Sequence, residues 1–490
     1  MNWAITVTFE DGAEWIFRAP IPGKYPDDVT AALIASEVAT IQCIAQRTTV
    51  PVPTIFAFSP HKDNDIGVPY ILQSKAKGTC LLDYSIRAAT GKGAHLTDEQ
   101  CALVMRQLGD FTEQLSRVRF PQIGSLVRHD DDGSTGDYAI GPCLAPAFVW
   151  SHRHLLDNLK RGPFDRQDAY FAALAEALFH HAQELPMEHH ALLAPLPVAD
   201  EYLDSDNSRD SKAYLAAMGR WNDFLAVGSK IDHSRNRFAF CMAANVLRES
   251  IVPILCDKNG DDTRPCPCAD EGFPLMHPDL NVGNIFVDEA MNVTCIIDWS
   301  SATTAPLVEL FAVPRLWDQS VIAPASSADP FRQALQICAL QEREGEAASQ
   351  GARWWALTDT AFAFQRLTRL CSSHDYDDFV ACISSAACAG LGRGEDCGAL
   401  TAVDTVLDLL GEHAERASSK ALLAEMQEDN PTPGEVAALE QVSFREADRK
   451  AASDRLAVAR KLTVVWHMNP RFVADARLWK WLARALGEQE

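Results

Sequence analysis

The chain has 490 residues, of which 47% are hydrophobic and 23% charged, so it is an ordinary globular protein large enough for two or more packed lobes. Its 67 Asp and Glu outnumber 44 Lys and Arg, which gives a formal net charge of −23. A chain of that charge repels phosphate backbones and anionic lipid, so we expect no nucleic-acid partner and no membrane partner.

The cellular location is predicted from the cysteines and from the start of the chain. Residues 1–7 have no basic segment followed by an apolar run, and no stretch of about 18 uncharged apolar residues occurs. The fourteen cysteines are scattered, mostly singly in apolar surroundings, which is typical of reduced core thiols rather than of a disulfide framework. We therefore expect a soluble cytoplasmic protein.

The first 80 residues are predicted to form a small sheet with one helix. Residues 5–9 alternate, Asp11-Gly12 signals a hairpin, and a second strand covers 14–18. A helix from about Asp28 to Arg47 follows. Two further strands are expected, at 54–58 and at 69–73.

The rest of the chain is mainly helical in pattern. Residues 97–100 read as a capping box at the start of a helix, and a β-ribbon is expected after residue 120. Further helices are predicted at about 167–184, 212–226 and 235–252, within 331–490, and as a charged helix over 435–461.

The most informative segment is the run from His277 to Asp288, HPDLNVGNIFVD, with Ile296-Ile297-Asp298-Trp299 after it. Asn284 lies five residues after Asp279, and Asp298 ends an apolar run fourteen residues later. The polar residues 288–292 predict a hairpin turn that brings Asp298 back beside Asn284.

This spacing matches the needs of phosphoryl transfer. The reaction needs a carboxylate near the acceptor hydroxyl and two oxygen ligands that hold Mg²⁺ against the nucleotide phosphates. Asp279, Asn284 and Asp298 supply that set, and no other nucleotide or hydrolase motif is present in the sequence.

H-x-D-x-x-x-x-N followed by I-D-W resembles the aminoglycoside phosphotransferase and choline kinase branch of the protein-kinase-like fold, in wording closest to its fungal subfamily. The resemblance implies an α+β fold with two lobes. A small β-rich N-lobe would cover 1–77 and a large, mainly helical C-lobe 78–490. The C-lobe would hold the catalytic loop 277–284, the metal loop 298–300 and the acceptor-binding helices.

The resemblance also implies residue roles. Asp279 would be the catalytic base, Asn284 and Asp298 the Mg²⁺ ligands, and His277 a brace for the loop. Arg18 and Glu37 would form the pair that places the phosphates of ATP, although a surface arginine on an edge strand is the alternative.

The segment 74–78 sits where this fold binds adenine through backbone groups, with Ser74 and Ala76 as the expected contacts. A loop that joins a strand to a helical region would have a similar sequence. Side chains alone do not separate the two.

One part of the family pattern is missing. The resemblance expects a strand and a glycine- or serine-rich phosphate-covering turn first, but only residues 1–4 precede the strand at 5–9. Either the N-lobe is truncated, or nucleotide binds without that turn, or phosphoryl transfer has been lost.

We therefore expect an ATP- and Mg²⁺-dependent phosphotransferase that acts on a hydroxyl of a small-molecule acceptor. The alternative is a catalytically inactive, pseudokinase-like binding or scaffold protein, and a third is a related transferase of another group. Nothing in the sequence names the acceptor, the oligomeric state or the choice between ATP and GTP.

Overall fold

The computed structural model describes residues 2–93, 95–128, 138–187, 234–256, 272–317, 323–335, 346–370 and 409–430. The chain divides into two compact units, the first formed by 1–174, 250–365 and 381–397 and the second by 175–249, 366–380 and 398–490. All predicted site residues belong to the first unit. The predicted helices at 212–226 and 435–461 lie outside the described residues.

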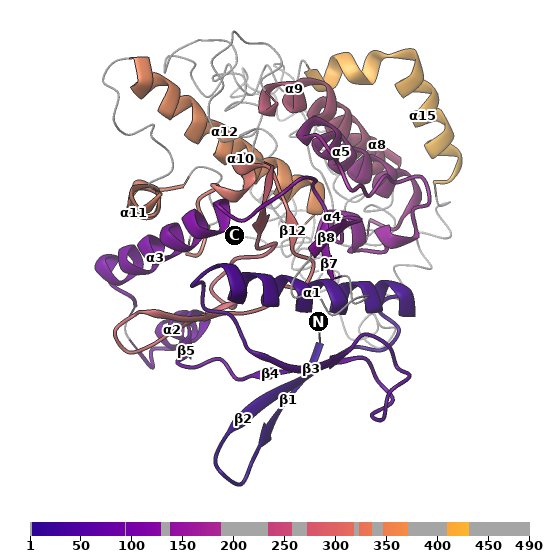
Figure 1. Ribbon diagram of the computed structural model, residues 1–490. Helices are drawn as coiled ribbons and strands as arrows, with labels where there is room; N and C mark the ends of the chain where they lie inside the picture. The colour runs from indigo at the N-terminus through magenta and orange to yellow at the C-terminus, as the bar shows by residue number, and fades with distance from the viewer. Residues whose placement is uncertain are drawn as a thin grey trace, which may run out of the picture. The chain divides into compact units, whose positions relative to one another are not determined.

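Most elements of the first unit are labelled in Figure 1. In chain order they are β1 (Asn2–Thr8), β2 (Glu14–Pro20), α1 (Asp27–Arg47), β3 (Ile55–Ser59), β4 (Tyr70–Ser74), β5 (Thr79–Cys80), α2 (Leu81–Ala89), α3 (Asp98–Ser116), β6 (Arg119–Phe120), β7 (Ser125–Arg128), β8 (Tyr138–Gly141), α4 (Pro146–Val149), the 3-10 turn η1 (Arg153–Leu155), the start of α5 (Gln167–Glu184), α9 (Val252–Leu255), β9 (Phe273–Met276), β10 (Ile285–Val287), β11 (Val293–Ile296), β12 (Thr303–Thr304), α10 (Leu307–Leu310), α11 (Ala325–Ala334) and most of α12 (Glu346–Arg369).

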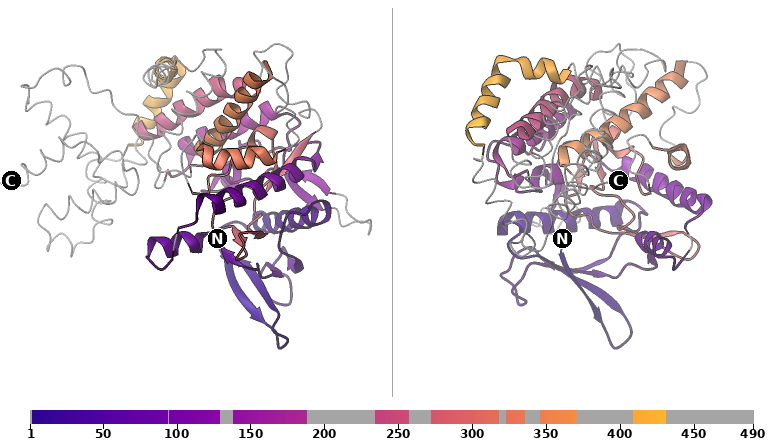
Figure 2. Two further views of the ribbon diagram at one scale, coloured as in Figure 1. Left: turned by 90° about the vertical axis from the view of Figure 1, so that its left-hand side faces the viewer. Right: turned by 180° about the vertical axis from the view of Figure 1, so that it is seen from behind.

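An antiparallel sheet with the strand order β1-β2-β4-β3 opens the chain. Helix α1 packs on one face of it through Ile34 and Val38, which contact Ile71 of β4; both views of Figure 2 show the helix along that face. Arg18 of β2 pairs in register with Ile71. Because side chains at paired positions of a sheet share a face, Arg18 also points toward α1.

The catalytic and metal loops leave from two small antiparallel sheets. One has the order β12-β9-β6, and β9 ends immediately before His277. The other has the order β11-β10-β5, and β10 begins immediately after Asn284. Strand β5 follows the predicted adenine segment 74–78, so this segment runs directly into the sheet that carries the metal loop.

The second unit contains the rest of α5, α8 (Ser234–Val246), the start of the π-helical turn η3 (Leu247–Ile251) and α15 (Ala417–Glu428). The ends of its segments are tied together by polar contacts. Asn430 accepts a hydrogen bond from the Ser234 N–H at 3.0 Å, and Arg416 donates to Glu249 at 2.8 Å. None of the predicted site residues lies in this unit.

The predicted elements that fall on described residues are largely confirmed. The opening hairpin, the helix of α1 and the strands β3 and β4 start and end within a few residues of the expected positions. The capping box at Thr97 is formed in both directions, and α5 covers the predicted 167–184. The ribbon expected after residue 120 is the hairpin β7-β8, whose tip lies outside the described residues.

The predicted α+β class is confirmed by this mixture of helices with small antiparallel sheets. Residues 1–77 and the catalytic loop belong to the same compact unit. The predicted division into lobes at 77/78 is not tested by these units and stays a prediction.

Two helices of the described chain are long and apolar enough to span a membrane by length and composition, Asp27–Arg47 and Asn236–Leu255. Both are more than half buried, as core helices also are. The first is α1, which packs on the sheet and carries a buried glutamate, Glu37.

Candidate active site

His277 braces the catalytic loop through both ring nitrogens. Its Nδ1 lies 3.1 Å from the backbone N–H of Asp279, and its Nε2 lies 2.9 Å from the carbonyl oxygen of Ile297. An N–H can only donate and a carbonyl can only accept, so this geometry assigns the neutral ring with the proton on Nε2. The ring also packs edge-on against Trp299 at 4.6 Å. The predicted bracing role is confirmed.

The catalytic loop turns back on itself between Asp279 and Asn284. Asn281 accepts a hydrogen bond from the Gly283 N–H at 2.7 Å, and the Asn284 N–H donates to the Asn281 carbonyl at 3.0 Å. The Asn284 Nδ2 donates to the carbonyl oxygen of Asp279 at 2.8 Å. Since that carbonyl only accepts, the amide nitrogen of Asn284 must face it, which leaves Oδ1 on the other side for a cation.

The side chain of Asp279 is exposed at the surface of the loop. Within the described residues its carboxylate makes no hydrogen bond or ion pair. Its backbone is held by the side chains of His277, Asn281 and Asn284. The loop therefore fixes the backbone of Asp279 and leaves its carboxylate oxygens exposed.

The β10-β11 hairpin brings Asp298 to Asn284, as the sequence predicts. Ile285 pairs in register with Ile296, and the Ile297 N–H donates to the Asn284 carbonyl at 2.9 Å. Asp298 is the next residue, so it follows directly on the residue that is bonded to Asn284.

Asp298 itself has an unusual backbone. Its φ is 63°, the left-handed region, which aspartate tolerates better than most residues but at some cost in energy. The Ser300 hydroxyl donates to its Oδ1 at 2.8 Å, and the side chain is 47% exposed. The loop thus holds a half-exposed, oriented carboxylate at a strained position, which is a common property of functional sites.

Arg18 and Glu37 form a buried ion pair. The Arg18 Nη1 donates to Glu37 Oε1 at 2.8 Å and Nη2 donates to Oε2 at 3.3 Å, with side chains only 12% and 3% exposed. This overturns the alternative of a surface arginine. Burial tends to lower the pKa of Arg18, but the carboxylates of Glu37 and Asp298 raise it above its ordinary value, so the guanidinium stays charged.

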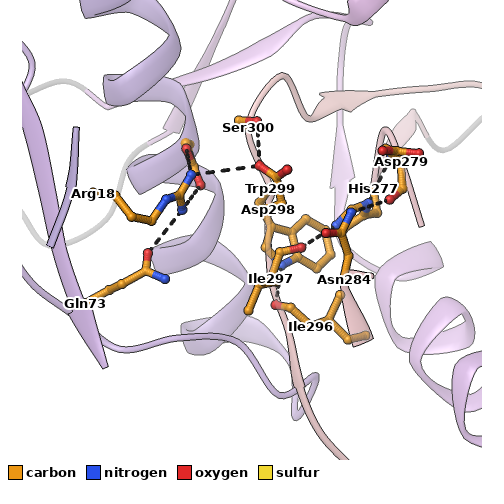
Figure 3. Close-up of polar contacts among 11 residues, drawn as sticks. Arg18, Gln73, His277, Asp279, Asn284, Ile296, Ile297, Asp298, Trp299 and Ser300 are labelled. Atoms are coloured by element: carbon orange, nitrogen blue, oxygen red, sulfur yellow. Dashed lines mark hydrogen bonds and ion pairs between the residues drawn. The ribbon is translucent and has the colours of Figure 1, made fainter. Parts of the chain in front are cut away.

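The same arginine reaches the metal loop. Its Nη2 lies 3.9 Å from Oδ1 of Asp298. Contacts therefore run from Glu37 to Arg18 and on to Asp298. The preceding residue, Ile297, is bonded to Asn284, which in turn contacts Asp279. Figure 3 shows Arg18, Asp298, Asn284 and Asp279 in this order across the view.

One residue of this network is missing from the sequence prediction. Gln73 of β4 is 4% exposed, and its Oε1 accepts a hydrogen bond from Arg18 Nη1 at 3.3 Å. The only signal was strand alternation, because Gln73 lies two residues from the buried Ile71 and so shares its face. A polar residue at such a position in a buried strand needs a partner.

The predicted adenine segment begins where β4 ends. The Ser74 N–H donates to the Thr54 carbonyl at 2.9 Å, and its hydroxyl accepts from the Thr54 N–H at 2.9 Å. These groups of Ser74 are thus used within the protein. Among the described residues the backbone of Ala76 makes no hydrogen bond. Ala76 therefore has backbone groups available for a ligand, whereas the Ser74 N–H does not.

The oxygen ligands suit magnesium that arrives with a nucleotide. In the part of the chain that the structure describes, no three His, Cys, Asp or Glu residues cluster as a metal site. Asp298 and the Asn284 Oδ1 supply one carboxylate and one amide oxygen. Mg²⁺ is commonly bound by one or two carboxylates, with phosphates and waters completing its octahedron. The residues present fit such an ion.

Comparison with known proteins gives limited matches. No model of a known protein family matches the chain. A subtelomeric hrmA-associated cluster protein of Aspergillus fumigatus is 30% identical over 168 residues, 33% of this chain and 31% of that protein. Altered inheritance of mitochondria protein 9 of Scheffersomyces stipitis is 23% identical over 251 residues, 47% of this chain and 38% of that protein.

The chain spans about a third of the length of these relatives. Among solved structures, the ethanolamine kinase of Plasmodium vivax is similar with a TM-score of 0.39 and 11% identity, over 79% of each chain. A TM-score below 0.5 does not establish a common fold. Membership of the fungal subfamily stays a prediction.

The comparisons contradict the predicted cytoplasmic location. Altered inheritance of mitochondria protein 9, found in several yeasts, is a mitochondrial protein by its name. The prediction failed because reduced cysteines exclude an oxidising compartment but do not separate one reducing compartment from another.

Proposed function

We propose that this chain is an ATP- and Mg²⁺-dependent phosphotransferase that acts on a hydroxyl of a small molecule. The proposal places it with the aminoglycoside phosphotransferase and choline kinase family that its motifs resemble. The observations that support it most are the contacts from Glu37 through Arg18 to Asp298, and those from Ile297, the neighbour of Asp298 in the chain, through Asn284 to Asp279. Phosphoryl transfer needs a fixed cation, metal ligands and a carboxylate base in one place.

Each residue has one role in the proposal. The exposed carboxylate of Asp279 orients the acceptor hydroxyl and takes its proton. Asp298 and the Oδ1 of Asn284 hold Mg²⁺, which when bound neutralises charge on the nucleotide phosphates. Arg18, kept charged and oriented by Glu37, contacts the phosphates from the other side.

The base of the nucleotide is proposed to bind at 74–78. This segment connects β4, which carries Gln73, with β5, which pairs with β10 of the metal hairpin. The Lys77 carbonyl accepts a hydrogen bond from Thr294 of β11 at 2.5 Å. A purine bound by the backbone of Ala76 would therefore be held in a fixed position relative to the residues proposed to bind the phosphates and Mg²⁺.

Replacing Asp279 by asparagine tests the proposal. Asp279→Asn keeps the shape of the side chain but removes its ability to accept a proton. Two rates are measured: the release of phosphate from ATP, and the formation of phosphorylated product from a panel of hydroxyl compounds, detected by mass spectrometry. We expect both rates to fall by about 10²-fold or more. ATP affinity should change by less than about twofold because Asp279 does not contact the nucleotide.

Glu289→Gln is the matched control, since it removes one charge from the exposed tip of the β10-β11 hairpin. It should leave both turnover and affinity unchanged. Unchanged turnover in Asp279→Asn contradicts the base assignment. ATP binding without turnover in the wild-type chain would favour the inactive, pseudokinase-like alternative.

A further inference from the structure

The guanidinium of Arg18 contacts a neutral side chain, Gln73, besides the carboxylates of Glu37 and Asp298. Glu37 accepts from both Nη1 and Nη2, at 2.8 and 3.3 Å. Gln73 accepts from Nη1 as well, at 3.3 Å. Figure 3 shows Gln73 on the far side of Arg18 from Asp298.

The contact to Gln73 matters because a guanidinium is planar. A lysine ammonium presents rotating donors around a point charge, but an arginine contacts a phosphate well only in certain orientations of its plane. Two hydrogen bonds to the Glu37 carboxylate align one edge of that plane but still allow the plane to tilt about this edge. Gln73, as an additional acceptor for Nη1, limits this tilting. It thereby keeps Nη2 on the side of Asp298, 3.9 Å from its Oδ1.

Gln73 is a buried polar residue, and its burial would cost free energy without a hydrogen-bond partner such as Arg18. Gln73 pairs in register with Ile16 and is 4% exposed, on the face of the sheet that packs against α1. A buried amide without a hydrogen bond loses its bonds to water and gains nothing in return. As a neutral acceptor, Gln73 orients Arg18 without cancelling more of its charge, whereas a further carboxylate beside Glu37 and Asp298 would compete with the phosphates.

We propose that Gln73 is a positioning residue, whose amide oxygen fixes the plane of the Arg18 guanidinium so that it meets the nucleotide phosphates. The inference rests on the proposed nucleotide-binding function and extends it to a residue outside the recognised motifs. Gln73 acts through Arg18 and contacts neither the base nor the metal.

Gln73→Met tests this role, because methionine has nearly the same length and volume but no strong acceptor. The affinities of ATP and of adenosine are measured by calorimetry in the presence of Mg²⁺. We expect ATP to bind about tenfold more weakly to the variant, in line with the loss of a hydrogen bond to a charged group. Adenosine lacks phosphates, so its affinity should not change.

Gln42→Met is the matched control, since Gln42 accepts a hydrogen bond at 2.9 Å from Arg128, which is not a residue of the proposed site. It should leave both affinities at the wild-type values.

A second experiment tests the same inference with a different pair of proteins. In an Arg18→Lys background the ammonium has no plane to fix, so adding Gln73→Met should weaken ATP by less than about twofold.

Three results overturn the inference. Equal ATP affinity in the wild type and in Gln73→Met shows that Gln73 does not position Arg18, and leaves the proposed function standing. Parallel losses for ATP and adenosine show a contact with the base or a damaged fold. A wild-type chain that binds neither ligand overturns the inference together with the proposed function.

Discussion

At the scale of single residues, the ion pair of Arg18 and Glu37 is the best-defined feature of the site. Both side chains are nearly buried, and the guanidinium has partners on β4, α1 and the metal loop. Such a pair does not have to stabilise the fold, because the cost of taking two charges out of water offsets their attraction. The effect of the pair is to hold the Arg18 guanidinium, a cation, at a defined position.

Removing one partner should therefore be damaging. Glu37→Leu leaves the Arg18 charge buried without its main counterion, and we expect a loss of about 3 kcal/mol in the free energy of unfolding, measured with urea. Asp27→Asn breaks the exposed pair with Lys62, whose N···O distance of 2.7 Å is equally short. That variant should unfold like the wild type. A Glu37→Leu protein as stable as the wild type would contradict the expected cost of leaving the buried Arg18 without its counterion.

The residues found from sequence are those with a fixed spacing. His277, Asp279, Asn284 and Asp298 are constrained by one loop and one hairpin, so their positions follow from local structure. Arg18 and Glu37 were found only because the family resemblance names such a pair. Gln73 was missed since its partner lies 55 residues away, and no local pattern connects the two.

At the scale of elements, the local signals were enough to locate helices and strands but not to say how closely they pack. Helix α3 illustrates this. Its capping box at Thr97 was readable from sequence, whereas the reason for Gly109 in its middle was not. A Cβ on Gly109 would lie 2.4 Å from the carbonyl oxygen of Phe331 in α11. The glycine lets the two helices approach.

This close approach predicts opposite effects of one substitution at two helical glycines. Gly109→Ala should destabilise the protein by about 2 kcal/mol through overpacking, although alanine is the better helix former. Gly411 lies in the helical residues 409–415, and nothing lies within 4 Å of a Cβ there. Gly411→Ala should instead stabilise by up to about 1 kcal/mol. Urea unfolding of both variants measures this, and a neutral Gly109→Ala would contradict the tight contact.

At the scale of the whole molecule, the amino-acid composition predicted neither the cellular location nor the division into compact units. A net charge of −23 and reduced cysteines were compatible with more than one compartment, and the cytoplasmic prediction failed. The two compact units join segments that are distant in sequence, such as 1–174 with 250–365. Such a division depends on long-range packing, which composition shifts along the chain do not reveal.

The central claim, a nucleotide site built on Arg18, Asn284 and Asp298, is tested most directly by calorimetric titration of ATP with and without Mg²⁺. We expect binding to the wild-type chain to depend on Mg²⁺. In Asp298→Ala, which removes the only carboxylate proposed to hold the ion, binding should be at least about tenfold weaker and insensitive to Mg²⁺. ATP binding of equal strength in the variant, or no binding to the wild-type chain, would contradict the account.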